Sequence, residues 1–228
     1  MVDVANADAV AVLTRAPSAG GKTRLFAALR RPPDPDLLAA LLLDTIDGVT
    51  MPGVRLVVAV TPPGACDEIA RLIAGLMPDG ADIPIVDQPQ GDLGDRMRGT
   101  MAGLFDLGAR AVALVGSDLP SITDKPIRAA FDLLRREPDA LILGPALDGG
   151  YYLVAATRVP QVFTGINWGS RTVLDETRAA ALRAGLRVHL VETVADVDTI
   201  DDLQRLSAPS RTVAWRQRHG IGQRGTVT

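Results

Sequence analysis

The chain has 228 residues, of which 47% are hydrophobic, 22% are charged and only 4% are aromatic. This balance is typical of a globular protein whose core is filled by aliphatic side chains. With one cysteine and two histidines, the sequence excludes an internal disulfide framework and argues against a structural zinc site.

The net charge of −3 is distributed unevenly. Residues 208–228 contain four arginines and no acid, so the rest of the chain carries −7. An acidic body argues against nucleic-acid binding. We expect residues 208–228 to be a basic, solvated and partly disordered C-terminal tail; the alternative is an arm that closes over a phosphate or a partner.

The sequence shows neither a secretory signal nor a membrane-spanning segment. The first ten residues contain two acids and no base, unlike the start of a secretory signal. The longest apolar run, residues 37–43, is far shorter than the ~20 residues that a membrane-spanning helix needs. We therefore expect a cytoplasmic protein with no membrane partner.

Hydrophobic patterning predicts strands and helices that alternate along the chain. In chain order, the expected elements are strand 9–14, helix 35–49, strand 54–60, helix 67–76, strand 83–86, helix 93–107, strand 111–115, helix 124–136, strands 140–143 and 151–155, helix 170–184, strand 187–191 and helix 199–206. This order predicts an α/β fold: one domain over residues 1–207, with a doubly wound, mostly parallel sheet covered by helices on both faces. Ligands bind at the carboxyl ends of strands in such sheets, so functional residues are expected directly after the strands.

The segment after the first strand, residues 15–24, combines glycines with cations. Glycine lets backbone N–H groups approach a phosphate, and lysine and arginine neutralise its charge. A strict Walker A loop is excluded because Ala16 stands where its first glycine would be. The prolines at 32–33 also limit the following helix to about two turns. We expect either a surface turn with incidental charge or, as the favoured interpretation, a nucleotide-binding loop formed by Arg15, Gly20, Gly21, Lys22 and Arg24.

Two acidic segments predict a metal site. Asp118 follows the buried strand 111–115, where a carboxylate is costly unless it is paired or binds a cation. Asp196 and Asp198 lie on one face of an extended segment, and two adjacent like charges also favour a cation. Mg²⁺ binds one or two carboxylates together with substrate phosphates. We expect Asp118, Asp196 and Asp198 to bind Mg²⁺ or Mn²⁺; the alternative is turn or helix capping.

Polar residues near three helix starts are expected to cap helices. Residues 199–202 resemble a capping box, and Asp92 fits the start of helix 93–107. Arg96, one turn further, is expected to reach a phosphate. Ser170 fits the cap of helix 170–184, where free N–H groups would also bind an anion, so Gly169 and Ser170 are candidate substrate-binding residues.

The sequence Asp-Gly-Gly at 148–150 follows strand 140–143. Taken alone it is an ordinary hairpin signal. Two glycines after an acid also let a flat ring or a sugar lie against the backbone. We therefore expect Gly149 and Gly150 to bind substrate and Asp148 to act as a base, the alternative being a turn alone.

Taken in order, these segments resemble the family DUF2064, also labelled a glycosyltransferase-like, radical-SAM/selenodomain-associated transferase. The motifs that carry the resemblance are Gly-Lys-Thr-Arg-Leu (21–25), Gly-Asp-Leu-Gly-Asp-Arg-Met (91–97), Gly-Ser-Asp-Leu-Pro (116–120), Gly-Pro-Ala-Leu-Asp-Gly-Gly-Tyr-Tyr-Leu (144–153), Trp-Gly-Ser (168–170) and Asp-Val-Asp-Thr (196–199). The family belongs with the GT-A nucleotide-diphospho-sugar transferases and is similar to the 2-phospho-lactate and molybdenum-cofactor guanylyltransferases. The resemblance covers about residues 9–206. It implies a GT-A fold in which Asp118 holds the metal and residues 15–24 hold the nucleotide.

The function we expect is a metal-dependent transferase with a nucleotide-activated donor and a small-molecule acceptor. The family label favours glycosyl transfer from a sugar nucleotide, in which Asp118 and Lys22 stabilise the charge that develops on phosphate. The cationic loop and the single acid at Asp118 favour nucleotidyl transfer from a nucleoside triphosphate, with release of pyrophosphate. A non-catalytic nucleotide-binding module and a P-loop kinase are weaker alternatives, since the set of acids is intact and Ala16 departs from the Walker pattern.

Overall fold

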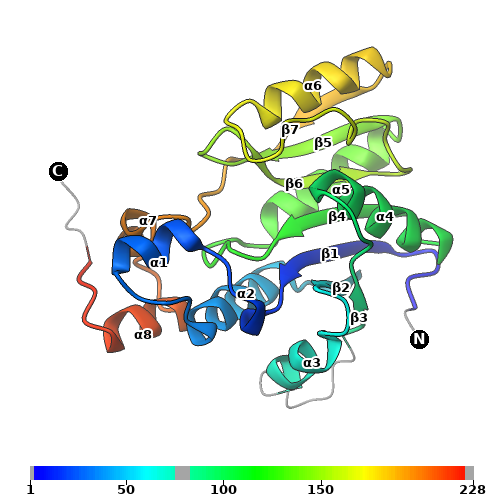
Figure 1. The fold of residues 1–228 in the computed structure, drawn as a ribbon. Coiled ribbons are helices and arrows are strands. Elements are labelled where there is room, and N and C mark those ends of the chain that lie inside the picture. The colour runs from blue at the N-terminus through cyan, green and yellow to red at the C-terminus, as the bar shows by residue number, and fades with distance from the viewer. Residues whose placement is uncertain (1–2, 75–82, 224–228) are drawn as a thin grey trace.

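The fold is that of a computed structural model in which residues 3–74 and 83–223 are described. Within these residues, seven strands form one sheet with the order β3-β2-β1-β4-β6-β5-β7 (Figure 1). The strands are β1 (Asp8–Arg15), β2 (Val54–Thr61), β3 (Ile85–Asp87), β4 (Ala111–Gly116), β5 (Ala140–Pro145), β6 (Tyr151–Ala156) and β7 (Arg187–Leu190). In this described part, β6 alone is antiparallel to its neighbours. The sheet is therefore mostly parallel, as the alternation of elements predicts.

Helices cover both faces of the sheet. On one face lie α2 (Pro35–Val49), α3 (Cys66–Ala74) and α5 (Lys125–Arg136). On the other face lie α4 (Leu93–Asp106) and α6 (Val173–Arg183). The expected end of the helix after β2, at residue 76, lies outside the described residues.

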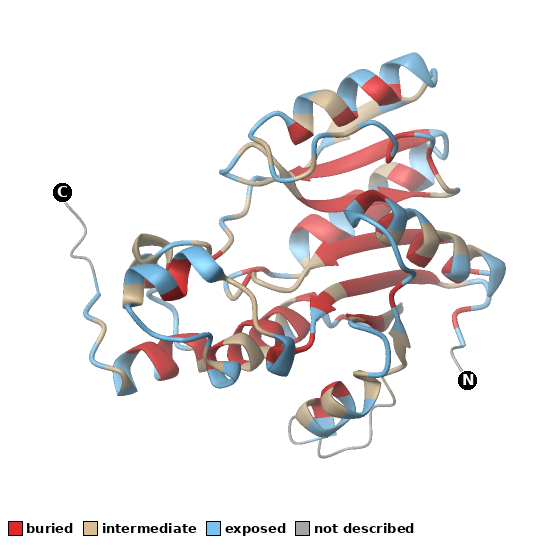
Figure 2. Cartoon of the chain, viewed as in Figure 1, coloured by how far each residue is buried: buried red, intermediate tan, exposed pale blue. Residues whose placement is uncertain are grey.

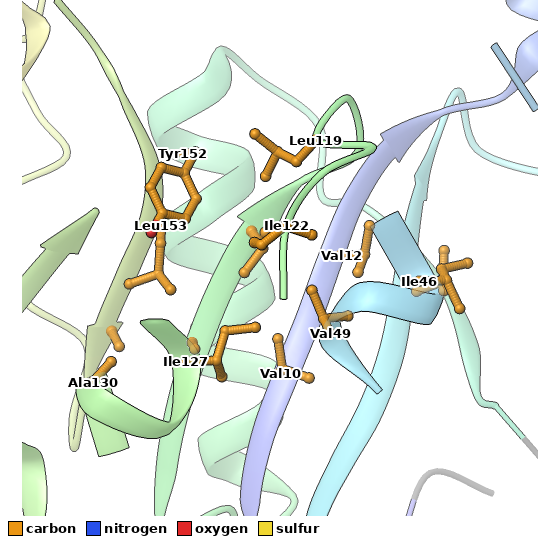
Figure 3. Packing of buried hydrophobic residues seen from close by; sticks show 14 of the residues in the cluster. Val10, Val12, Ile46, Val49, Leu119, Ile122, Ile127, Ala130, Tyr152 and Leu153 are labelled. Atoms are coloured by element: carbon orange, nitrogen blue, oxygen red, sulfur yellow. The ribbon is translucent and has the colours of Figure 1, made fainter. Parts of the chain in front are cut away.

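The core forms because the strands alternate their apolar side chains between the two faces. In β1, Val10 and Val12 belong to the cluster beneath α2 and α5, whereas Ala9 and Ala11 belong to the cluster beneath α4. Figure 3 shows Val12 beside Ile46 and Val10 beside Val49, both of α2. The central strands are buried throughout most of their length (Figure 2), and each fully buried aliphatic side chain contributes about 1.5–3 kcal/mol.

Helix α2 has the boundaries that the sequence predicts. The Asp34 side chain accepts a hydrogen bond from the backbone N–H of Asp36 and caps the helix, while Pro35 occupies its first position. Thr45, within the helix, reaches across to the loop after β4, where its Oγ1 accepts a hydrogen bond from the N–H of Leu119 at 3.0 Å. The helix therefore fixes the segment that carries Asp118.

The C-terminal segment differs from the expectation of a solvated tail. Residues Arg211–Arg218 form α8, which packs with α1 (Thr23–Leu29), α2 and α7 (Ile200–Arg205) in a third hydrophobic cluster. Trp215 is fully buried, and its Nε1 donates a hydrogen bond to Asp34 Oδ2 at 3.1 Å. The expectation is wrong for α8 because its apolar side supplies part of a core. Residues 224–228 lie outside the described part.

Arg216 explains why a basic segment can be buried here. The residue is 2% exposed, and its Nη1 donates to the carbonyl oxygens of Leu203, Gln204 and Leu206, at 3.1, 3.2 and 2.7 Å. These are the carbonyls at the C-terminal end of α7, which lack partners within their own helix. Arg216 thus caps α7 rather than closing over a phosphate.

The order of the strands positions a functional site. From β1 the chain runs outward to β2 and β3, then returns to β4 on the other side of β1. The carboxyl ends of β1 and β4 therefore border a crevice, the usual ligand site of such sheets. Figure 1 shows α1, α7 and α8 gathered beyond the arrowheads of these two strands. None of the helices in the described residues is long and apolar enough to span a bilayer.

Candidate active site

Three carboxylates meet at the carboxyl end of β4. Asp118, Asp196 and Asp198 each offer one oxygen, and these oxygens all lie within 4.8 Å of one another. Asp118 lies in the loop after β4, and its backbone oxygen accepts a hydrogen bond from Val197 N–H at 3.0 Å. This bond joins the segment before α7 to the end of the sheet.

The alternation of side chains brings Asp196 and Asp198 to the same side, as the sequence predicts. Val197, between them, is 1% exposed and packs into the cluster of α1, α2, α7 and α8. Directly after it, Thr199 and Asp202 form the expected capping box, which starts α7. The segment therefore has an anchored apolar side and a carboxylate side that faces the crevice.

Lys22 lies among these acids. Its Nζ donates hydrogen bonds to Asp118 Oδ2 and Asp198 Oδ1. The residue has left-handed backbone angles, φ 48° and ψ 41°, at the start of α1, which is uncommon for a side chain with a Cβ. Burial lowers the pKa of Lys22, but Asp118 and Asp198 outweigh this and raise the pKa above its ordinary value. Lys22 is therefore a charged ammonium held by two carboxylates.

Asp196 is the electrostatically strained member of the cluster. Burial, followed by repulsion from Asp118 and Asp198, raises its pKa from 3.8 to about 6. Lys22 partly offsets this repulsion but donates hydrogen bonds to the other two acids. A second cation would relieve the strain.

A polar cavity of about 470 Å³ lies on the Lys22 side of Asp118. Its wall includes all five residues of the expected nucleotide-binding loop, together with Asp118, Asp148 and Asp198. The two glycines have positive φ, 71° at Gly20 and 144° at Gly21, which glycine adopts at no steric cost. The expected nucleotide loop, Arg15, Gly20, Gly21, Lys22 and Arg24, thus lines one cavity beside the acids.

A second, more apolar cavity of about 290 Å³ lies on the other side of Asp118, against α4 and β6. Asp148, Gly169 and Asp118 line both cavities. The expected substrate residues Gly150 and Ser170 line this one. The carboxylates thus stand between a cationic space and an apolar space.

Two of the predicted site residues do not line either cavity. The Arg96 side chain donates through Nε to the Asp92 carbonyl at 3.3 Å, and its contact with a phosphate stays a prediction. Gly149 has φ +95°, and a Cβ there would lie 2.1 Å from the Arg171 carbonyl oxygen. This glycine therefore permits a close backbone approach to the segment before α6, and its contact with a substrate stays a prediction.

Ser170 also differs from its expected role as a cap. Helix α6 begins at Val173 with Thr172 as its N-cap, three residues later than predicted. Ser170 Oγ instead accepts a hydrogen bond from Thr172 N–H at 3.2 Å. The serine hydroxyl shapes the turn before the helix. Asp92, by contrast, caps α4 as expected, through its acceptance of the Asp95 N–H.

Sequence reasoning missed the aromatic wall of the apolar cavity. Tyr151, Tyr152 and Trp168 line this cavity; Tyr151 and Trp168 make an edge-to-face contact with ring centroids 6.4 Å apart. A signal existed, because the chain has only two Tyr and two Trp, and three of the four lie within the motifs at 144–153 and 168–170. Thr45, which holds the loop of Asp118, gave no comparable signal.

The carboxylate oxygens of Asp118, Asp196 and Asp198 fit a hard divalent cation such as Mg²⁺. Mg²⁺ and Ca²⁺ prefer carboxylate oxygens at about 2.0–2.6 Å, so oxygens on one such ion lie no more than about 4–5 Å apart. The three acids, within 4.8 Å of one another, meet this requirement with little movement. Lys22 is held by two of the same carboxylates, so an ion would have to displace its ammonium.

Comparisons with known proteins agree with this architecture. Residues 45–170, more than half of the chain, match the family described as "Uncharacterized protein conserved in bacteria (DUF2064)". A protein of Desulfovibrio desulfuricans G20, provisionally assigned as a nucleotide-diphospho-sugar transferase, has a solved structure with a TM-score of 0.78; it is 27% identical, and the match covers 95% of this chain and 96% of that one. No curated protein sequence matches the chain.

More distant structures share the fold. CMP:2-keto-3-deoxy-manno-octonic acid synthetase, solved in complex with CTP, is 14% identical with a TM-score of 0.55, over 93% of this chain and 100% of that one. A cytidylyltransferase from Leptospira borgpetersenii is 13% identical with a TM-score of 0.56, over 98% of this chain and 99% of that one. These likenesses confirm the predicted α/β fold with its mostly parallel sheet.

Proposed function

Since the chain belongs to the DUF2064 family and has the fold of nucleotide-using transferases, we propose that it is a metal-dependent transferase with a nucleotide-activated donor. The observation that carries this proposal is the position of the three carboxylates, between a cationic cavity and an apolar one. Such an arrangement suits a substrate whose charged part and reacting part lie on opposite sides of one cation.

In this proposal the polar cavity holds the phosphates of the donor. Arg24 and Arg15 offer bidentate contacts, and Lys22 offers a point charge. The backbone of Gly21 lies at the same wall and offers its N–H to a phosphate, whereas the N–H of Gly20 donates to the Pro17 carbonyl oxygen at 3.1 Å. Asp118, Asp196 and Asp198 would hold Mg²⁺ or Mn²⁺, which, when bound, supplies positive charge to the diphosphate as it leaves.

The transfer we favour is glycosyl transfer. Asp148 lines both cavities, and its Oδ1 is held by the N–H of Gly150 at 2.9 Å. An exposed carboxylate at this place can take the proton of an acceptor as that acceptor attacks the sugar. Lys22, freed from the acids by the cation, would then neutralise the leaving diphosphate.

Nucleotidyl transfer is the second candidate. The single acid after β4 and the cationic loop support it, and so does the likeness of the fold to cytidylyltransferases. In that reaction a nucleoside triphosphate occupies the polar cavity, and a phosphate or carboxylate of the acceptor attacks its α-phosphorus. Pyrophosphate, rather than a nucleoside diphosphate, is then the product.

The test is nucleotide binding with and without Mn²⁺, measured by calorimetry for UDP, GDP, UTP and GTP. We expect Asp118→Asn to remove the Mn²⁺-dependent part of the affinity. The matched control is Asp175→Asn, which changes a carboxylate that is 80% exposed on α6 and should bind as the wild type does. Equal Mn²⁺-dependent affinity in Asp118→Asn and the control would contradict the proposal.

A further inference from the structure

The wall of the apolar cavity carries no cation. Among the described residues that line it there is no Lys, Arg or His, whereas three carboxylates, Asp118, Asp148 and Asp196, reach it. The polar cavity differs because three cations, Arg15, Lys22 and Arg24, balance the three acids in its wall. The two spaces on either side of Asp118 therefore select for different charges.

The remaining wall of this cavity is neutral and largely aliphatic or aromatic. Leu93 and Met97 contribute from α4, and Trp168 from the segment before α6. Burial raises the pKa of both Tyr151 and Tyr152, so neither phenol carries charge. Tyr152 has already used its hydroxyl, which donates to the Glu192 carbonyl at 2.9 Å.

We infer that this cavity takes an uncharged acceptor with an apolar, ring-containing body and a free hydroxyl group, an inference that rests on the proposed transferase function. Aromatic rings and aliphatic side chains bind such a body by burial and by ring contacts. A phosphate or carboxylate in the same place meets Asp148, which forms no ion pair with the described residues, and is repelled even when Lys22 and a metal ion neutralise Asp118 and Asp196.

This charge selection distinguishes the two candidate reactions. Nucleotidyl transfer needs an anionic nucleophile, whereas glycosyl transfer needs a hydroxyl group. In the step we infer, the acceptor oxygen forms a bond to the anomeric carbon while the bond from that carbon to the β-phosphate oxygen breaks. The electron pair leaves with the nucleoside diphosphate, and the hydroxyl proton passes to the Asp148 carboxylate. The cavity therefore favours glycosyl transfer.

The test compares two probes that differ in charge, 4-butylphenol and 4-butylphenyl phosphate. Both are titrated calorimetrically into the full chain, with inorganic pyrophosphate present to occupy the cations of the polar cavity. We expect the phenol to bind at least tenfold more tightly than its phosphate ester. Equal binding, or tighter binding of the ester, overturns the inference.

A matched pair of variants on α4 locates the binding. Leu93→Lys places a cation in the cavity wall, at a residue that is 38% exposed; Leu107→Lys makes the same change just after the other end of the helix, at a residue that is 45% exposed. We expect Leu93→Lys to weaken phenol binding at least fivefold and to strengthen binding of the ester. Leu107→Lys should change neither, and identical effects of the two variants would place the binding elsewhere and overturn the inference.

Failure of the inference and failure of the proposed function have different signatures. A protein that prefers the phosphate ester but binds nucleotide with Mn²⁺ overturns the inference alone. A protein that prefers the phenol but binds no nucleotide overturns the proposed function, and with it the acceptor role of the cavity.

Discussion

Asp196→Asn should make the metal-free protein more stable. Raising the pKa of Asp196 from 3.8 to about 6 corresponds to about 3 kcal/mol of destabilisation once the group is fully ionised. Because Asp196 is only half-buried, solvent screening reduces this to about 1–2 kcal/mol. Asparagine has nearly the same shape and carries no charge, so the variant should recover that amount above pH 7.

The direction in which the unfolding free energy changes with pH follows from proton binding. The folded pKa lies above the unfolded one, so the folded state binds more protons between pH 3.8 and about 6. The unfolding free energy of the metal-free wild type therefore falls as pH rises through this window, relative to the variant. Urea unfolding in the presence of EDTA, at pH 4 and pH 7.5, measures the difference directly. We expect near equality at pH 4 and a more stable variant at pH 7.5.

The same variant should bind Mn²⁺ more weakly, because it removes a charged ligand. A capping role for Asp196 would give the opposite pattern, a loss of about 1 kcal/mol in the metal-free protein and unchanged Mn²⁺ affinity. That pattern, or a stability difference that is the same at both pH values, would refute the electrostatic argument.

Three further changes test other parts of the structure. Lys22→Met should weaken nucleotide binding by about 1.5–3 kcal/mol yet strengthen Mn²⁺ binding to the nucleotide-free protein, because the competing ammonium is gone; calorimetry with each ligand alone measures both. Trp215→Ala should lower the unfolding free energy by about 3–5 kcal/mol, since the side chain is fully buried; a loss below about 1 kcal/mol would mean that α8 is not docked. Gly149→Ala should destabilise more than Gly165→Ala in thermal unfolding, because both have positive φ but only the Cβ at 149 would meet the Arg171 carbonyl.

Local sequence signals were sufficient to predict much of the sheet and its helices. The capping Asp34 and the Pro that follows it define the start of α2, and the apolar stripe defines its length. The carboxylate cluster was also predictable, because a buried valine between Asp196 and Asp198 forces both acids to one side. In each case the signal lies within a few residues of the feature.

Features that depend on distant contacts were not predictable. The sequence predicts that Lys22 belongs to a phosphate-binding loop. It does not predict the hydrogen bonds of Lys22 to Asp118 and Asp198, because these residues are 96 and 176 positions away in the chain. The burial of α8 was not predicted because arginines usually indicate a solvent-exposed segment. Here Arg216 is buried because it donates hydrogen bonds to the free carbonyl groups at the end of α7. Sequence patterns describe charge but not the partner that neutralises it.

If the site binds Mn²⁺ and a nucleotide as proposed, the ammonium of Lys22 among the carboxylates makes the binding of these two ligands interdependent. A cation that arrives alone must compete with a tethered positive charge at high effective concentration, and phosphate that arrives alone must draw Lys22 away from acids that then stand unneutralised. When both bind, the phosphate draws Lys22 away from the carboxylates, and the cation neutralises the carboxylates that Lys22 has left. Thermodynamic reciprocity then requires that Mn²⁺ raise nucleotide affinity by the same factor by which nucleotide raises Mn²⁺ affinity. Such a site discriminates against free divalent ions and free anions alike, and responds to their complex.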